Sequence, residues 1–116
     1  MKKLFLTDKA LDDIQDIYDF SYAEWGETTA LKYIRDFEES FVLLQENNGL
    51  LKINKKISSR FMAYPVQKHF LICDIIGDHI YVLTVKHTSM NLLERMKKLE
   101  PTLENEAKAL YNKSST

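Results

Sequence analysis

The sequence predicts a single α+β domain with a short N-terminal strand, a helical hairpin, a three-strand antiparallel meander and C-terminal helices. The chain has 116 residues, the usual size of one domain. Apolar residues recur at helical spacing in the first half and near the C-terminus, while the stretch between them is rich in Phe, Ile, Val and Tyr, as strands are. The composition, 45% hydrophobic and 28% charged, excludes a disordered chain.

The first strand and the first helix follow each other directly. Residues 3–6 form a short apolar run, and Thr7 is a suitable N-cap for a helix over residues 8–25. Gly26 then ends the helix. Trp25 is expected to fill the core. The apolar positions of this helix are Leu11, Ile14, Ile17, Tyr18, Tyr22 and Trp25.

A second amphipathic helix completes a helical hairpin. Thr28 or Thr29 is the expected cap, and Asn47-Asn48-Gly49 closes the helix. The apolar faces of the two helices need a common partner. The stripe of the second helix consists of Ala30, Ile34, Phe37, Phe41 and Leu44.

Three strands are predicted next, over residues 60–64, 68–76 and 79–87. Pro65 separates the first from the second, and Gly77-Asp78 forms a two-residue turn before the third. That turn pairs residues whose numbers sum to 155. His87 therefore lies beside Lys68, while His69 lies beside Lys86 on the opposite face, so neither face holds both histidines.

Both faces of this meander are largely apolar, so both need a cover. The helical hairpin covers one, and either the C-terminal segment or another protein covers the other. Because Pro101 interrupts the helical pattern, we expect one helix to end near Leu99 and another to begin at Pro101. The main domain then spans residues 1–100, and residues 101–116 form a helical extension with a frayed end.

The composition excludes several classes of protein. The single cysteine, Cys73, makes an internal disulfide impossible and is expected in the core. No Cys or His spacing resembles a zinc site, so we expect no metal and no cofactor. No apolar run approaches the roughly 20 residues that span a bilayer, and the apolar start is too short for a signal peptide. We expect a cytoplasmic protein without a membrane partner.

Charge is unevenly distributed. Residues 1–46 hold five Lys and Arg against eleven Asp and Glu, whereas residues 47–73 hold five cations and no acid. The basic stretch suits either a phosphate backbone or a solvated loop that balances the acidic helices. The pI of about 6.3 is low for a protein that lives on nucleic acid. An acidic helix face, solvated or able to meet basic groups, is formed by Asp12, Asp16 and Asp19.

Four motifs in order carry a family resemblance. They are Ala10-Leu11-Asp12-Asp13-Ile14, Trp25-Gly26, Arg60 at a strand start, and Val85-Lys86-His87-Thr88-Ser89-Met90-Asn91. Together they resemble the RelE/ParE superfamily of toxins from bacterial type II toxin–antitoxin systems, from Leu4 to about Leu99. The last motif is similar to the apolar-His-x-x-Met-Asp ending of the ParE branch. The chain departs from the pattern at Asn48, Lys86 and Asn91, where Pro, an apolar residue and Asp are usual.

The resemblance implies a toxin that inhibits DNA gyrase by binding and is neutralised by a cognate antitoxin in a hetero-oligomer. A flexible antitoxin segment would fold onto the toxin and bury apolar surface. We expect that contact on the sheet face or in the groove beside the helical hairpin. The candidate antitoxin-binding residues on the sheet are Phe70, Ile72 and Leu83.

The RelE branch implies an alternative, a ribosome-dependent mRNA endonuclease. Attack by a ribose 2′-hydroxyl needs proton transfer and cations around the phosphate. Arg60, Lys86 and His87 are the catalytic candidates, although a surface ion pair for Arg60 and a strand-capping role for His87 are also open. The basic residues that would hold the RNA backbone are Lys52, Lys55 and Lys56. A third possibility is a non-toxic member that retains only partner binding.

Overall fold

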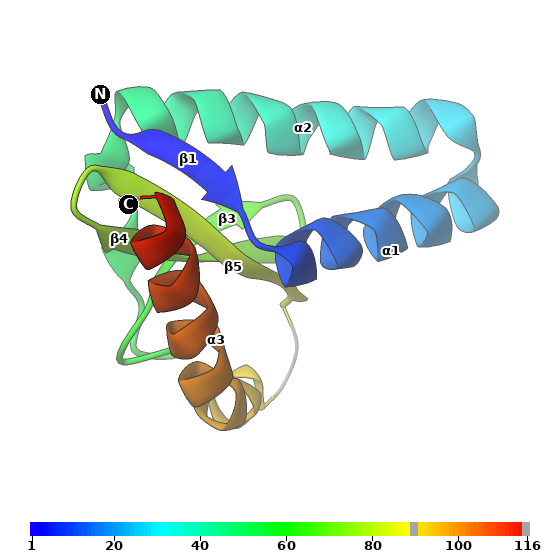
Figure 1. Ribbon diagram of the computed structural model, residues 1–116. Coiled ribbons are helices and arrows are strands. Elements are labelled where there is room, and N and C mark those ends of the chain that lie inside the picture. The colour runs from blue at the N-terminus through cyan, green and yellow to red at the C-terminus, as the bar shows by residue number, and fades with distance from the viewer. Residues whose placement is uncertain (89–90, 115–116) are drawn as a thin grey trace.

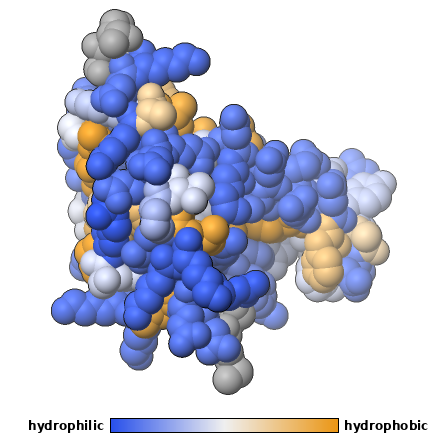
Figure 2. Space-filling model, turned by 60° about the horizontal axis from the view of Figure 1, so that its bottom comes forward, coloured by the Kyte–Doolittle hydropathy of each residue, from blue (hydrophilic) through white to orange (hydrophobic). Residues whose placement is uncertain are grey.

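The computed structural model describes residues 1–88 and 91–114 and shows a mixed five-stranded sheet between two helical layers (Figure 1). The helical hairpin, α1 (Asp8–Trp25) and α2 (Glu27–Glu46), packs on one face of the sheet. Its outer end projects beyond the sheet and carries apolar surface (Figure 2). The C-terminal helix, α3 (Leu92–Ser114), packs on the other. The strands, in the spatial order β1-β5-β4-β3-β2, are β1 (Lys3–Leu6), β5 (His79–His87), β4 (His69–Ile76), β3 (Met62–Val66) and β2 (Lys52–Ile53).

The N-terminal strand and first helix are confirmed. The Thr7 hydroxyl accepts a hydrogen bond from the Ala10 N–H at 3.1 Å, which is the predicted N-cap. Gly26 ends α1 with a positive φ of 92° and is also the residue before α2. The predicted cap at Thr28 or Thr29 is therefore wrong. A glycine at positive φ reverses the chain in one residue, so α2 begins at Glu27 without a side-chain cap.

The first meander strand differs from its prediction at both ends. β3 begins at Met62 rather than at residue 60, and it runs through Pro65 to Val66. The prediction that Pro65 ends this strand is wrong, because the neighbouring β2 reaches only as far as Ala63. Beyond Ala63, β3 is an edge strand, where a residue without an N–H is tolerated. The two-residue β2 was not predicted.

A β-bulge changes the register of the central hairpin. The Gly77-Asp78 turn is confirmed, and the predicted pairing holds from Ile76 opposite His79 to Cys73 opposite Val82. Leu83 is then an extra residue on β5, and Ile72 pairs with Thr84.

The shifted register continues to the end of the hairpin, where His69 lies opposite His87. The prediction that these two histidines lie on opposite faces is therefore wrong. The shift by one residue turns every later β5 side chain to the other face. Val85, for example, packs into the core under the hairpin.

Each face of the sheet has its own core. Under the hairpin, Phe37 and Leu44 of α2 pack on Cys73, which is buried as predicted. The other face is covered by α3, where the sequence allowed either the C-terminal segment or another protein. The main buried residues there are Ile72, Tyr81, Leu83, Met96, Leu103 and Ala107.

The C-terminal segment is one helix, not two. α3 is continuous with Pro101 inside it, so the predicted break near Leu99 is wrong. The first turns of α3 are seen end-on in Figure 1 and the later turns lengthwise, as a proline kink would produce. Met96 before the proline and Leu103 after it bury against the same face, which stabilises both parts. The helix also crosses the boundary placed between residues 100 and 101.

Some sequence features fall outside the described residues. These are Ser89 and Met90 of the last motif and the expected frayed end at residues 115–116. Within the described residues, no helix is long and apolar enough to cross a membrane.

Candidate functional site: a pocket between the hairpin and the sheet

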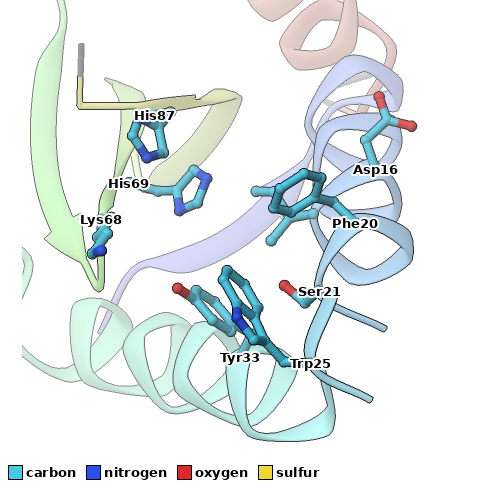
Figure 3. Close-up of a pocket in the computed structure, with 9 residues that line it drawn as sticks. Asp16, Phe20, Ser21, Trp25, Tyr33, Lys68, His69 and His87 are labelled. Atoms are coloured by element: carbon cyan, nitrogen blue, oxygen red, sulfur yellow. The ribbon is translucent and has the colours of Figure 1, made fainter. Parts of the chain in front are cut away.

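A cavity of about 350 Å³ lies where the hairpin meets the ends of β4 and β5 (Figure 3). The two helices supply an aromatic side, on which Phe20 and Trp25 are 60% and 57% exposed and lie with their ring centroids 5.8 Å apart. The prediction that Trp25 fills the core is wrong, because it stands near the outer end of the hairpin. The lining residues are Asp16, Ile17, Phe20, Ser21, Trp25, Tyr33, Lys68, His69 and His87.

The bulge brings two histidines together in this pocket. The rings of His69 and His87 lie 5.1 Å apart, centroid to centroid, and are nearly perpendicular at 87°. Burial and the neighbouring His87 lower the pKa of His69 to about 4. His69 is therefore neutral at physiological pH, and its Nδ1 atom is buried with no hydrogen-bond partner among the described residues.

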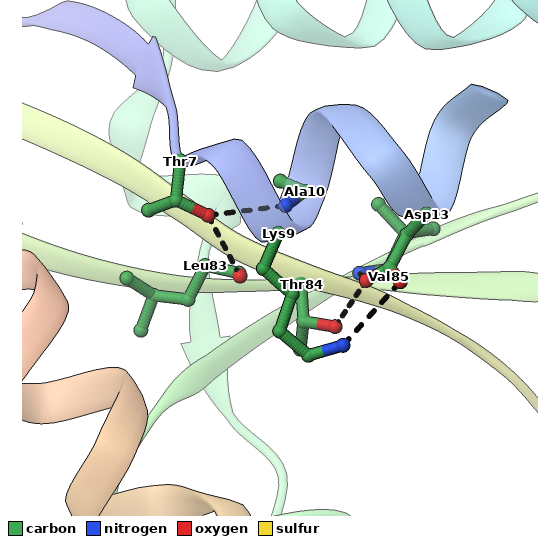
Figure 4. A network of polar contacts seen from close by, with 7 residues as sticks. All are labelled: Thr7, Lys9, Ala10, Asp13, Leu83, Thr84 and Val85. Atoms are coloured by element: carbon green, nitrogen blue, oxygen red, sulfur yellow. Dashed lines mark hydrogen bonds and ion pairs between the residues drawn. The ribbon is translucent and has the colours of Figure 1, made fainter.

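The N-terminal turns of α1 hold the bulge in place (Figure 4). The Thr7 hydroxyl donates to the Leu83 carbonyl at 2.9 Å. The Asp13 carboxylate accepts from the Val85 N–H at 3.0 Å and from the Thr84 hydroxyl. Because β1 ends just before Thr7, α1 replaces it as the hydrogen-bonding partner of β5. These contacts stabilise the register that turns His87 toward His69.

The three predicted catalytic residues lie in different surroundings. Arg60 forms an ion pair with Glu104 of α3 at 2.7 Å. Lys86 faces the start of α1, and its pKa is lowered by burial and by the nearby Lys9. Only His87 lines the pocket. The structure therefore does not bring Arg60, Lys86 and His87 together around one phosphate.

The other predicted residues lie outside the pocket. Lys52, Lys55 and Lys56 are exposed on and after β2, and none makes an ion pair with a described residue. Ile72 and Leu83 are fully buried under α3, and Phe70 packs against the same cluster. Among the described residues, no group of three or more His, Cys, Asp or Glu side chains is placed to hold a metal ion.

Sequence reasoning missed the pocket as a unit. Of its aromatic residues, Trp25 was predicted to lie in the core, and Phe20 and Tyr33 were not given a role. The predicted strand register did not include the bulge and therefore placed His69 and His87 on opposite faces of the sheet. The one usable signal was the cluster of Phe20, Tyr22 and Trp25, which together make the end of α1 aromatic on more than one face.

Comparison with known proteins decides the family. A family profile described as the ParE toxin of the type II toxin–antitoxin system parDE matches residues 4–92. The chain belongs to the ParE toxin family. The matched segment ends at Leu92, the first residue of α3, so nearly all of the helix that covers the second sheet face lies beyond it.

Individual ParE relatives are similar along most of their length. The chain is 24% identical over 91 residues to Toxin ParE1 of Caulobacter vibrioides, covering 78% of this chain and 94% of that toxin. It is 24% identical over 97 residues to Toxin ParE of Escherichia coli, covering 83% and 94%. A solved structure of the chromosomal ParDE TA system from P. aeruginosa shares the fold, with a TM-score of 0.67 and 22% identity over 77% of this chain and 98% of that one.

Proposed function

We propose that this ParE-family toxin inhibits DNA gyrase in the cytoplasm by binding it, and that a cognate antitoxin neutralises the toxin by occupying the pocket. Family membership supports the class of protein. The observation that carries the binding mechanism is the exposed aromatic pair Phe20 and Trp25 beside the pocket. Large exposed aromatic side chains next to a cavity are typical anchors of protein–protein contacts.

Charge supports a basic antitoxin segment as the occupant of this groove. The hairpin, residues 8–46, carries eleven acids against three cations. A segment that places apolar side chains against Phe20 and Trp25 would bring basic side chains to the acidic α1 face that includes Asp12 and Asp16. Complementary charge of this kind raises association rates and selects the partner.

The sheet residues expected to bind antitoxin remain a separate proposal. Ile72 and Leu83 are fully buried under α3, so an antitoxin would reach them only if it displaced that helix, whereas Phe70 is partly buried at the same cluster. The open groove beside the hairpin requires no such displacement. We therefore propose the groove as the first contact and the three sheet residues as a contact that follows movement of α3.

The ribonuclease alternative has less support. It needs cations and a proton acceptor around one phosphate, but Arg60 pairs with α3 while His87 lies in the pocket. The near-neutral charge of the chain also favours a protein target over the ribosome.

Induction of the toxin in a bacterium without antitoxin separates these functions. Growth arrest without new RNA 5′ ends across the transcriptome is the expected result. New 5′ ends in register with codons would establish the ribonuclease instead, and Arg60→Ala would then abolish arrest. Growth without arrest would identify a non-toxic member and contradict the proposal.

A further inference from the structure

The pocket has two chemically different walls that face each other across open space (Figure 3). The aromatic wall consists of Phe20, Trp25 and Tyr33 on the hairpin. The basic wall consists of Lys68, in the turn before β4, and His87, at the end of β5, together with the neutral His69. A small molecule that contacts both walls must therefore be flat and apolar on one side and must offer hydrogen-bonding or anionic groups on the other.

The aromatic wall is suited to stacking. Phe20 and Trp25 are both more than half exposed, so their ring surfaces are available to a ligand. Tyr33 stands beside His69 at 6.3 Å between ring centroids and continues the wall toward the sheet. Stacking of a nucleobase on an aromatic side chain contributes about 1–3 kcal/mol.

The basic wall offers charge and unused hydrogen-bonding capacity. Lys68 and His87 are exposed, and neither forms an ion pair with a described residue. The buried Nδ1 of His69 has no partner among the described residues, although buried polar atoms are nearly always paired. Asp16 is the acidic residue of the pocket lining and lies on α1, so it disfavours an anion on the helical side of the pocket. An anionic group is therefore best placed at the sheet.

We propose that this pocket binds a single nucleoside monophosphate, with its base against Trp25 and its phosphate at Lys68 and His87. A cavity of about 350 Å³ lies at the small end of the range for small-molecule sites, about 300–1,000 Å³. The acidic hairpin repels a long polyanion, so one nucleotide fits the charge distribution better than a strand of RNA. This site goes beyond gyrase inhibition and does not depend on it, although the nucleotide would compete with the antitoxin segment proposed above for the same pocket.

The protein contains its own reporter for the test. Trp25 is the only tryptophan, so intrinsic fluorescence follows the pocket directly. Purified toxin without antitoxin is titrated with adenosine monophosphate, adenosine and inorganic phosphate, with excitation where the nucleotide does not absorb. The monophosphate should change the emission saturably and bind about fivefold more tightly than adenosine. Inorganic phosphate alone should leave the emission unchanged. Calorimetry provides an independent affinity.

Two lysine variants test the basic wall. Lys68→Ala should lower the affinity for the monophosphate about fivefold and leave the affinity for adenosine unchanged, because it removes a cation and no stacking surface. Lys55→Ala removes an exposed cation outside the pocket and should have no effect on either ligand. Both positions are exposed, so both variants should fold.

The outcomes that overturn the proposal are specific. One is the absence of both a saturable fluorescence change and binding heat. Another is equal affinity for the monophosphate and adenosine, which would leave an apolar pocket without a phosphate site. A third is a short single-stranded RNA that binds far more tightly than the monophosphate, which would assign the site to a polymer. None of these results bears on gyrase inhibition, which is measured separately.

Discussion

The Asp13 carboxylate of α1 accepts a hydrogen bond from the backbone N–H of Val85 on β5 at 3.0 Å. Val85 lies two residues after the extra residue of the bulge, Leu83, and two residues before His87. A side chain in the second turn of the first helix thus holds the stretch of β5 that presents His87. The hydrogen bond connects the N-terminal segment to the geometry of the pocket.

Removal of this carboxylate should destabilise the fold. Asp13→Ala leaves the Val85 N–H and the Thr84 hydroxyl without their acceptor, and we expect a loss of about 2 kcal/mol in the free energy of unfolding. Asp12→Ala is the matched control, because Asp12 is exposed on the same turn and should cost less than about 0.5 kcal/mol. Urea unfolding measures both. Equal losses in the two variants would show that the hydrogen bonds at Asp13 do not stabilise the bulge.

The sequence predicted the elements better than their register. β1, α1 and the Gly77-Asp78 turn follow from local capping and turn chemistry, which neighbouring residues determine. The bulge at Leu83 depends on α1, which is distant in sequence. Since both faces of β5 are largely apolar, the hydrophobic pattern fits either register and cannot reveal a shift of one residue.

The same reasoning explains the errors at the two prolines. Pro65 and Pro101 were both interpreted as ends of elements, from local rules alone. Tertiary packing overrides those rules: β3 has a free edge at Pro65, and α3 is held to the sheet on both sides of Pro101. For the candidate site, the sequence singled out His87, which lines the pocket, whereas the places of His69 and Trp25 depend on the register and on the angle of the hairpin.

The stability of the protein should fall in mild acid because of His69. The unfolded chain takes up a proton at this side chain near pH 6.5, whereas the folded chain does so near pH 4. The neutral His69 side chain therefore makes its full contribution to the free energy of unfolding above pH 6.5, and this contribution is lost as the pH falls toward 4. We expect His69 to account for a loss of about 1–2 kcal/mol between pH 7.5 and pH 5.

Chemical denaturation of the wild type and His69→Phe at both pH values measures this contribution. The difference between the two proteins cancels the effects of other groups, such as Asp74, whose carboxyl pKa is raised by burial. The stability of His69→Phe, measured relative to the wild type at the same pH, should be higher at pH 5 than at pH 7.5. A difference that does not change with pH would contradict the assignment to His69.

The part of α3 after Pro101 should be essential to the fold. Leu103 is fully buried against the sheet face that holds Ile72 and Leu83, so Leu103→Ala should cost about 2–5 kcal/mol. Asn105→Ala changes an exposed position of the same helix and should have little effect. Thermal unfolding gives both values. A small loss at Leu103 would indicate that the C-terminal segment is a dispensable extension.

Antitoxin binding should depend on the aromatic end of the hairpin. Phe20→Asp places a charge in the proposed contact and should weaken capture of the antitoxin encoded beside the gene by at least about tenfold. Val42→Asp is the matched control, since Val42 is 54% exposed on α2 and does not line the pocket. Capture that is equal for the two variants would place the antitoxin elsewhere.

The most direct test of the proposed function is supercoiling of relaxed plasmid by purified DNA gyrase in the presence of this toxin. The proposal predicts that supercoiling falls as toxin is added and recovers when the cognate antitoxin is added in equal amount. Full supercoiling at a large molar excess of folded toxin would contradict the proposal that gyrase is the target.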